Sequence, residues 1–299
     1  MSRNAVTKGV QNCSVRIKTG MRRLRISAIS YLNTAPLMWG FEHGEAGRDF
    51  DISYTLPSAC ARELEAGTAD IGIIPAAAYT RIPDLVVIPD VAIASRRPVR
   101  SILLVSKVPV EKICTVALDT SSMTSVALTK VLFEKWLGGG REFSSAEPHI
   151  DKMLATHDAG LLIGDPALQV DCSRYVTLDL AEEWIRYTGK PFVFAFWAVR
   201  EAALHETEYL QDLAAVFQNS RDHGLEPATL DHIAREWGPR LGLAEASVRS
   251  YLTDNIYYKF DPACLEGLRL FYRYAAEVGA LPSAPEIRFA DAIKPCIAQ

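Results

Sequence analysis

A cluster of four small hydroxyl side chains, placed between a strand pattern and a helix pattern, constrains this chain more than any other feature. Residues 115–118 form a short apolar run, residues 121–126 read SSMTSV, and a 3.6-residue apolar stripe follows over residues 128–137. This order predicts a strand, a turn and a helix N-terminus. Free backbone N–H groups and the positive end of the helix dipole favour a carboxylate or phosphate there. One hydroxyl is enough to cap a helix, so the cluster is either a cap alone or an anion site.

The same arrangement recurs twice. Residues 24–29 alternate as a strand, polar Asn33 follows, and Pro36 can occupy the first turn of the next helix. A third strand ends at Gly164 and Asp165, and another helix starts at Pro166. Open α/β sheets bind ligands at the carboxyl ends of their strands. Asn33 and Asp165 are therefore either ligand contacts or caps of their own helices.

The remaining pattern predicts an α/β protein of two lobes. Strand patterns cover residues 52–56, 70–75, 85–88, 91–94, 101–106 and 191–199, and Ser58 is expected to cap a helix that ends at Gly67. Their alternation with helices predicts mainly parallel sheets. Residues after 201 are almost entirely helical in pattern. We expect the second lobe to be inserted in the first, with a ligand cleft between them.

An inserted lobe requires the chain to cross between the lobes twice, and the expected lobe boundaries lie at these two crossings. Lobe one comprises residues 22–106 and 195–299, and lobe two comprises residues 107–194. Residues 1–21 are expected to be a disordered tail. Their first 20 positions hold four basic residues and no apolar core, so they do not resemble a secretory signal, and we expect a cytoplasmic protein.

Composition excludes several function classes. The net charge of −4 and the absence of a basic block argue against nucleic acid and against an anionic membrane surface as partners. No apolar run is long enough to span a membrane. The six cysteines are scattered without metal-ligand spacing, so we expect reduced thiols and no metal site. A small molecule is the expected partner, and nothing predicts an oligomer.

The catalytic motifs that the sequence lacks limit its chemistry. It contains no GxGxxG, GxxxxGK[ST], GxSxG or HExxH. If the protein is an enzyme, its site is built from amides, hydroxyls and backbone N–H groups, and no cofactor is predicted. Such a site lacks an obvious strong general base. It suits a reaction with a large driving force, or one in which the substrate supplies its own base.

Six segments in order carry a resemblance to a known family. They are SYLNTAP (30–36), SACARELEAGTADIGIIP (58–75), PVRS (98–101), SSMTSVAL (121–128), LLIGDPAL (161–168) and TGKPFVFAFWA (188–198). Together they resemble the chorismate dehydratases of the futalosine route to menaquinone. That family is similar in fold to the type 2 periplasmic binding proteins, which matches the two-lobe layout. The resemblance implies a lyase of the cytoplasm.

Two alternatives stay open beside the dehydratase. A sister enzyme of that pathway makes 1,4-dihydroxy-6-naphthoate, and its opening motif resembles SPCPNDTF, whereas this chain reads SYLNTAP. The difference favours the dehydratase. A non-catalytic cytoplasmic binding protein for an aromatic acid could use the same cleft.

The resemblance implies the loss of water from chorismate to give 3-[(1-carboxyvinyl)oxy]benzoate. It assigns Asn33 and Ser101 to the catalytic positions, where they orient the leaving hydroxyl and the enolpyruvyl group. Because neither is a strong base, our hypothesis is that the enolpyruvyl carboxylate of the substrate takes the ring proton. The expected substrate-binding residues are Tyr31, Ser58, Arg100, Ser122, Thr124, Ser125, Gly164 and Asp165.

Overall fold

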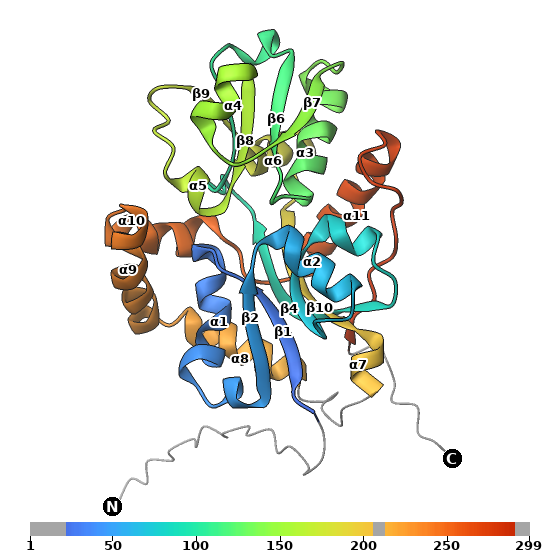
Figure 1. Ribbon diagram of the computed structural model, residues 1–299, viewed down its shortest axis with the longest axis vertical. Helices are drawn as coiled ribbons and strands as arrows, with labels where there is room; N and C mark the ends of the chain where they lie inside the picture. The colour runs from blue at the N-terminus through green and yellow to red at the C-terminus, as the bar shows by residue number, and fades with distance from the viewer. Residues whose placement is uncertain (1–21, 206–212, 291–299) are drawn as a thin grey trace, which may run out of the picture.

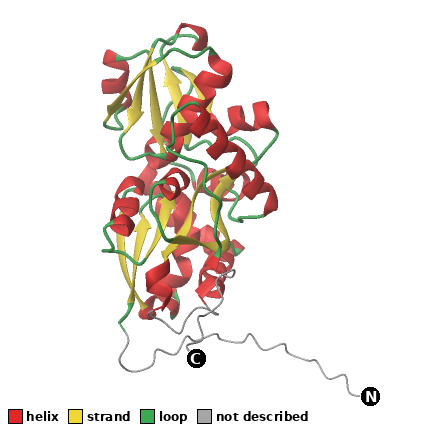
Figure 2. Cartoon of the chain, turned by 90° about the vertical axis from the view of Figure 1, so that its right-hand side faces the viewer, coloured by secondary structure: helices red, strands yellow, loops and turns green. Residues whose placement is uncertain are grey.

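The computed structural model describes residues 22–205 and 213–290, and they form two α/β lobes stacked along the long axis of the molecule (Figure 1). Within these residues the strands make two five-stranded sheets, ordered β2-β1-β3-β10-β4 and β7-β6-β8-β5-β9. Seen from the side, the two sheets lie one above the other with helices around their junction (Figure 2). The predicted two-lobe architecture, with the second lobe inserted in the first, is confirmed.

The elements of lobe one come from both ends of the described chain. Its strands are β1 (Leu24–Ile29), β2 (Phe50–Thr55), β3 (Ile71–Pro75), β4 (Leu85–Ser95) and β10 (Phe192–Arg200). Its helices are α1 (Ala35–His43), α2 (Pro57–Glu65), α7 (Glu201–His205), α8 (Leu213–Gly224), α9 (Pro227–Leu241), α10 (Glu245–Ser250) and α11 (Pro262–Glu277). Shorter helical segments that matter below are η1 (Leu32–Thr34), η3 (Ala76–Thr80) and η7 (Tyr251–Asn255).

Lobe two is one continuous stretch of chain. Its strands are β5 (Ile102–Ser106), β6 (Thr115–Asp119), β7 (Glu142–Ala146), β8 (Ala159–Ile163) and β9 (Val176–Asp179). Its helices are α3 (Thr124–Leu132), which continues into the π-helical segment η5 (Phe133–Leu137), α4 (Ile150–Thr156), α5 (Gly164–Leu168) and α6 (Leu180–Thr188).

The sheets are mixed, so the prediction of mainly parallel sheets is wrong. β1 runs parallel to β2 and β3, but β10 runs antiparallel to β3 and β4. In lobe two, β5 is antiparallel to β8 and β9. The strands that follow the two lobe crossings are thus the ones that reverse direction. The two short strands expected before the first crossing are one strand, β4, with register irregularities opposite β10.

The lobe boundaries also differ from the predicted ones, by the whole of β5 at the first crossing and by the first three residues of β10 at the second. Residues 102–106 were expected in lobe one, but β5 pairs with β8 and β9 of the second sheet. β10 begins at Phe192 and pairs within the first sheet, three residues before the expected position 195. The crossings therefore lie just before β5 and just before β10. The expected disordered tail, residues 1–21, lies outside the described residues.

Burial explains why the core strands are apolar throughout. Every residue of β3 is buried, as expected for a strand covered on both faces. At Gly72 a Cβ would lie 2.5 Å from Leu64 Cδ1 and 2.8 Å from Cys60 Sγ, so glycine lets α2 pack directly on this strand. Ser58 does not cap α2, since the cap position is Leu56 and Pro57 takes the first turn. That prediction is wrong because proline already fits the first turn without an N–H group.

An aromatic cluster joins the two lobes on the side of α11. Trp136 of η5 stacks on Tyr187 of α6, with ring centroids 4.8 Å apart. Trp184 of α6 meets Phe192 of β10 at 5.4 Å and Phe271 of α11 at 6.2 Å. The two lobes therefore pack against one another through these aromatic side chains.

Two further findings concern the described residues alone. No helix among them has the length and apolar character needed to cross a membrane. Their four cysteines, Cys60, Cys114, Cys172 and Cys264, are free thiols.

Candidate active site

A cavity lies between the lobes, where strand ends from both sheets meet. It encloses about 460 Å³ of space outside protein atoms, part of which is open to solvent. Six of the predicted site residues line it, namely Tyr31, Asn33, Ser122, Thr124, Ser125 and Gly164. Apolar side chains complete the wall, including Pro57, Ile93, Ile102, Met123, Ile163 and Phe194. The cavity therefore combines a flat apolar lining with a few polar groups.

The start of α3 supplies hydrogen-bond donors to this cavity. Ser122 stands one residue before Met123, the cap position of α3, and its Oγ serves as a cap by accepting from the Ser125 N–H at 3.3 Å. The N–H groups of Met123 and Thr124 donate no hydrogen bond within the described residues. Ser125 Oγ likewise has no partner there. The helix start thus has one cap and, beside it, the free N–H groups that a carboxylate needs.

Thr124 has a structural role at the same turn. Its Oγ1 donates to the Phe194 carbonyl at 3.0 Å and accepts from the Ala77 N–H at 3.1 Å. Both partners belong to lobe one, so this hydroxyl links the lobes. The main chain of Thr124, rather than its hydroxyl donor, is the part available to a ligand.

Asn33, Tyr251 and Ser101 form a polar group where the crossing into β5 meets lobe one. The Tyr251 hydroxyl donates to Ser101 Oγ at 2.8 Å, and Ser101 is completely buried. Asn33 is 9% exposed, and its Oδ1 has no hydrogen-bond partner among the described residues. Burial raises the pKa of Tyr251, while hydrogen bonding to Ser101 and Asn33 lowers it. Asn33 does not cap α1, whose cap position is Thr34. Its unpartnered acceptor is thus buried at a residue that lines the cavity.

A buried carboxyl of lobe two, that of Asp119, lies close enough to Tyr31 to influence its pKa. Asp119, at the end of β6, accepts from the Ser121 N–H at 2.8 Å and from its hydroxyl at 2.6 Å. Its other oxygen, Oδ2, is buried without a described partner, and burial raises the pKa of this carboxyl. Burial also raises the pKa of Tyr31, and hydrogen bonding to Ser121 lowers it. Burial thus disfavours the ionised form of Asp119, while the bonds from Ser121 favour it.

Gly164 lines the cavity from lobe two, and Asp165 follows it directly in the sequence. Gly164 has φ +61°, and a Cβ there would lie 2.7 Å from the Tyr31 ring, so two requirements select glycine. Asp165 Oδ1 accepts from the Leu32 N–H at 3.0 Å across the lobe interface. Burial raises the pKa of Asp165 to about 6, and the hydrogen bond from Leu32 lowers it in part. Asp165 therefore bonds to the opposite lobe and not to the start of its own helix.

Four predicted site residues do not line the cavity, namely Asp165, described above, and Ser101, Ser58 and Arg100. Ser101 is buried one residue before Ile102, which lines it. Ser58 contributes its N–H to the Ser121 carbonyl at 3.2 Å, a further link between the lobes. Arg100 is exposed, has φ +64°, and donates its backbone N–H to Asp179 Oδ2 at 2.6 Å. Its guanidinium has no partner within the described part of the chain, and its charge lowers the pKa of Tyr251.

Two residues of the site were missed in the sequence. Tyr251 lies in the helical C-terminal part, where no motif marks it and only the tertiary fold brings it to Ser101. Asp119 could have been found, because it is a carboxylate at the end of a predicted strand, two residues before the hydroxyl cluster. Over the described ranges, no group of three or more His, Cys, Asp or Glu side chains is placed to hold a metal ion. The polar groups at hand can orient an anionic small molecule and exchange a proton with it.

Solved structures with a similar fold support the two-lobe architecture. A protein from Archaeoglobus fulgidus superposes with a TM-score of 0.69 at 16% identity, covering 87% of this chain and 98% of its own. The periplasmic aliphatic sulphonate binding protein SsuA of Escherichia coli superposes with a TM-score of 0.61 at 17% identity, covering 93% and 94%. These similarities establish the periplasmic-binding-protein fold.

Sequence comparison identifies relatives with a stated activity. A chorismate dehydratase of Thermus thermophilus is 29% identical over 283 residues, which are 89% of this chain and 98% of the relative. A chorismate dehydratase of Campylobacter jejuni is 30% identical over 160 residues, 52% of this chain and 66% of the relative. The family model described as menaquinone biosynthesis matches residues 24–277, which include both lobes and every residue of the cavity. The chain therefore belongs to the menaquinone biosynthesis family.

Proposed function

We propose that this protein is a chorismate dehydratase, a hydro-lyase that converts chorismate to 3-[(1-carboxyvinyl)oxy]benzoate. The observation that carries the proposal is the cavity between the lobes, which pairs a buried, unpaired amide acceptor at Asn33 with free N–H donors at the start of α3. The two relatives of that name support it. We assign the reaction to the futalosine route to menaquinone, which agrees with the family.

Each end of the substrate has a suitable place in the cavity. A carboxylate of chorismate fits the start of α3, where it receives the N–H groups of Met123 and Thr124 and the Ser125 hydroxyl. Asn33 Oδ1 accepts a hydrogen bond from the ring hydroxyl. Ser101 holds Tyr251 beside Asn33 and thereby keeps the amide in place. The apolar walls, such as Ile93 and Phe194, contact the ring.

Proton removal from the ring does not require a strong base from the protein. Loss of the ring proton next to the enol ether, with departure of the neighbouring hydroxyl, makes the ring aromatic. The enolpyruvyl carboxylate of the substrate can take that proton once its conformation is fixed, since oriented intramolecular groups reach effective molarities on the order of 10⁵ M. Asn33, the start of α3 and the apolar wall fix that conformation.

The cytoplasm is the compartment that we propose for this reaction. Free cysteines are typical of a reducing compartment, and the four described cysteines are free.

The test is incubation of the purified protein with chorismate, without added metal or nucleotide. We expect a product lighter by one water, with a benzoate absorption spectrum. Unchanged chorismate from folded protein would contradict the proposal. Binding without turnover would then indicate a non-catalytic binding protein, and conversion of a cyclic futalosine substrate would indicate a naphthoate synthase.

A further inference from the structure

The structure places an incompletely bonded carboxyl at the lobe interface, beside the polar groups of the cavity. From this geometry we infer that Asp165 is the general acid that protonates the departing ring hydroxyl. The inference rests on the proposed function and adds the group that handles the leaving water.

The first support is the position of the carboxyl. Asp165 directly follows Gly164, which lines the cavity, and its Oδ1 is held by the Leu32 N–H at 3.0 Å. Leu32 lies between Tyr31 and Asn33, which both line the cavity from the other lobe. The carboxyl is therefore fixed at the cavity edge by a bond from the lobe that carries Asn33.

The second support is that half of the carboxyl is unused. Asp165 Oδ2 has no hydrogen-bond partner among the described residues, unlike the oxygens of Asp179, which are bonded to backbone N–H groups on both sides. An acid must have one oxygen free to carry the proton and another held to fix its direction. Asp165 meets both conditions.

The surroundings of Asp165 disfavour its ionised form. α5 packs against β5, β8 and η1, and none of these elements has a charged side chain. Tyr31 and Tyr251 sense the charge of Asp165; Asp119 also acts on Tyr31, and Arg100 acts on Tyr251. The end of α5 also meets α9, where Gln169 donates to the Leu241 carbonyl and the nearby Arg240 is paired with Glu236. A substrate with two negative charges disfavours ionisation of Asp165 further.

The step balances without any other reactant. The ring C–H bond next to the enol ether breaks, its proton passes to the enolpyruvyl carboxylate, and its electron pair forms the new ring double bond. The neighbouring C–O bond breaks with its electron pair on oxygen, and Asp165 gives that oxygen its proton, so water leaves. Proton transfer from the enolpyruvyl carboxyl, directly or through solvent, restores the acid.

The test compares Asp165→Asn, Asp165→Glu and wild type in turnover of chorismate between pH 5 and 8. Asparagine keeps the Oδ1 acceptor for Leu32 but cannot donate an acidic proton. We expect kcat of Asp165→Asn to fall about 10²-fold or more, the usual range for general acid catalysis. In wild type we expect kcat/KM to decrease toward high pH. Asp165→Glu should show the same alkaline decrease, and Asp165→Asn should not. Binding of the product, 3-[(1-carboxyvinyl)oxy]benzoate, should stay within about threefold in all three.

A matched control lies at the other end of the same strand. Asp158 precedes β8, and its Oδ2 accepts from the N–H groups of Cys114 and Thr115, away from the cavity. Asp158→Asn should keep the wild-type pH profile. Turnover of Asp165→Asn within threefold of wild type, or retention of the alkaline limb by this variant, would overturn the inference. Failure of wild type itself to dehydrate chorismate would instead refute the proposed function.

Discussion

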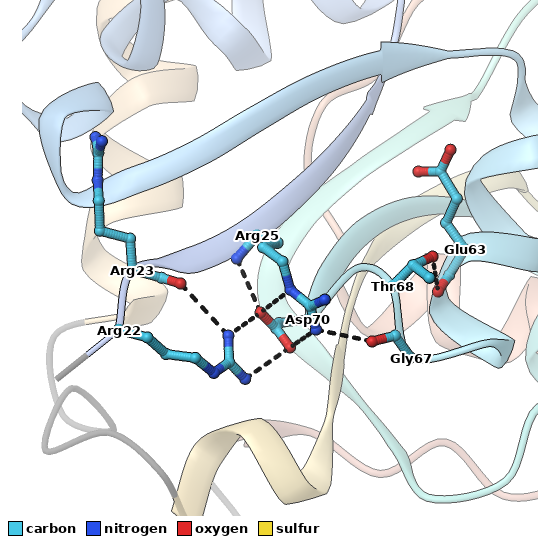
Figure 3. A network of polar contacts seen from close by, with 7 residues as sticks. All are labelled: Arg22, Arg23, Arg25, Glu63, Gly67, Thr68 and Asp70. Atoms are coloured by element: carbon cyan, nitrogen blue, oxygen red, sulfur yellow. Dashed lines mark hydrogen bonds and ion pairs between the residues drawn. The ribbon is translucent and has the colours of Figure 1, made fainter.

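Asp70 and Asp165 lie at opposite ends of the strands that they adjoin, and their carboxyl groups differ in hydrogen-bond partners. Asp70 precedes β3, at the end of the first sheet away from the cleft, and its side chain is completely buried. Arg22 and Arg25 converge on it (Figure 3), with bonds of 3.0 Å from Arg22 Nη2 and 2.9 Å from Arg25 Nη2 to Oδ1. The Arg25 N–H and Nε donate to Oδ2 at 2.9 and 3.1 Å. Asp165, at the cleft, accepts a single hydrogen bond from the described part of the chain.

The difference in partners gives opposite pKa shifts. Burial works against ionisation of Asp70, but the bonds from Arg25 and Arg22 outweigh it and lower the pKa of this carboxyl far below its usual value. Burial of Asp165 is only partly offset by Leu32, so its pKa rises to about 6. A fully paired carboxyl stabilises the fold, whereas a partly paired carboxyl in a cleft keeps reactivity for a ligand. We therefore assign a structural role to Asp70 and a catalytic role to Asp165.

The largest effect is expected at the unpaired amide of the cleft. Asn33→Ala should lower turnover about 10² to 10³-fold, about 3–4 kcal/mol, because the ring hydroxyl loses its acceptor in the transition state. Its free energy of unfolding should fall by no more than about 1 kcal/mol, since the hydrogen bond to Tyr251 is lost but the buried Oδ1 has no described partner to lose. Steady-state kinetics and urea unfolding measure the two quantities. A variant that keeps turnover within threefold would remove Asn33 from the mechanism.

Gly164→Ala is expected to have the next largest effect. The new Cβ would meet the Tyr31 ring at 2.7 Å and would sit at φ +61°, so we expect a loss of about 2–3 kcal/mol of stability. Gly189→Ala is the matched control, because Gly189 has φ +66° but nothing within 4 Å of its added Cβ. It should lose about 1 kcal/mol from backbone strain alone. Equal losses in urea unfolding would mean that the Tyr31 contact does not constrain this position.

Asp70→Asn tests the paired side of the comparison. We expect a loss of about 1–3 kcal/mol in unfolding free energy at pH 7, since the arginines lose a charged acceptor. Because the pKa of Asp70 is lowered in the folded protein, its stabilisation is fully present above about pH 4 and is lost as the pH falls. The difference between wild type and variant should therefore shrink in acid. Glu45→Gln, at an exposed ion pair, should change stability by less than about 0.5 kcal/mol.

Local pattern was sufficient where one segment defines a feature by itself. The strand before Gly164 and Asp165, the turn before α3 and the helix after Pro36 are set by neighbouring residues, and they were predicted. The antiparallel direction of β10 and the sheet to which β5 belongs depend on pairing between distant segments, which a local pattern does not contain. Tyr251 was missed for the same reason. Whether Asp165 caps its own helix or bonds across the cleft depends on Leu32, 133 positions away in the sequence.

The most direct test of this account measures the stability of Asp165→Asn at pH 8 and its turnover at pH 5, where the wild-type carboxyl is protonated. The pKa of Asp165 is about 6 in the folded protein, above the reference value of 3.8. The free energy of unfolding therefore falls as the pH rises from about 4 to 6, and the full cost of ionising this carboxyl is present above pH 6. Asparagine cannot ionise, so it removes this cost, and its Oδ1 still accepts a hydrogen bond from the Leu32 N–H. We predict unfolding free energy higher by about 1–2 kcal/mol together with turnover lower by about 10²-fold. A less stable variant, or one with wild-type turnover, would contradict the assignment of chemistry to this carboxyl.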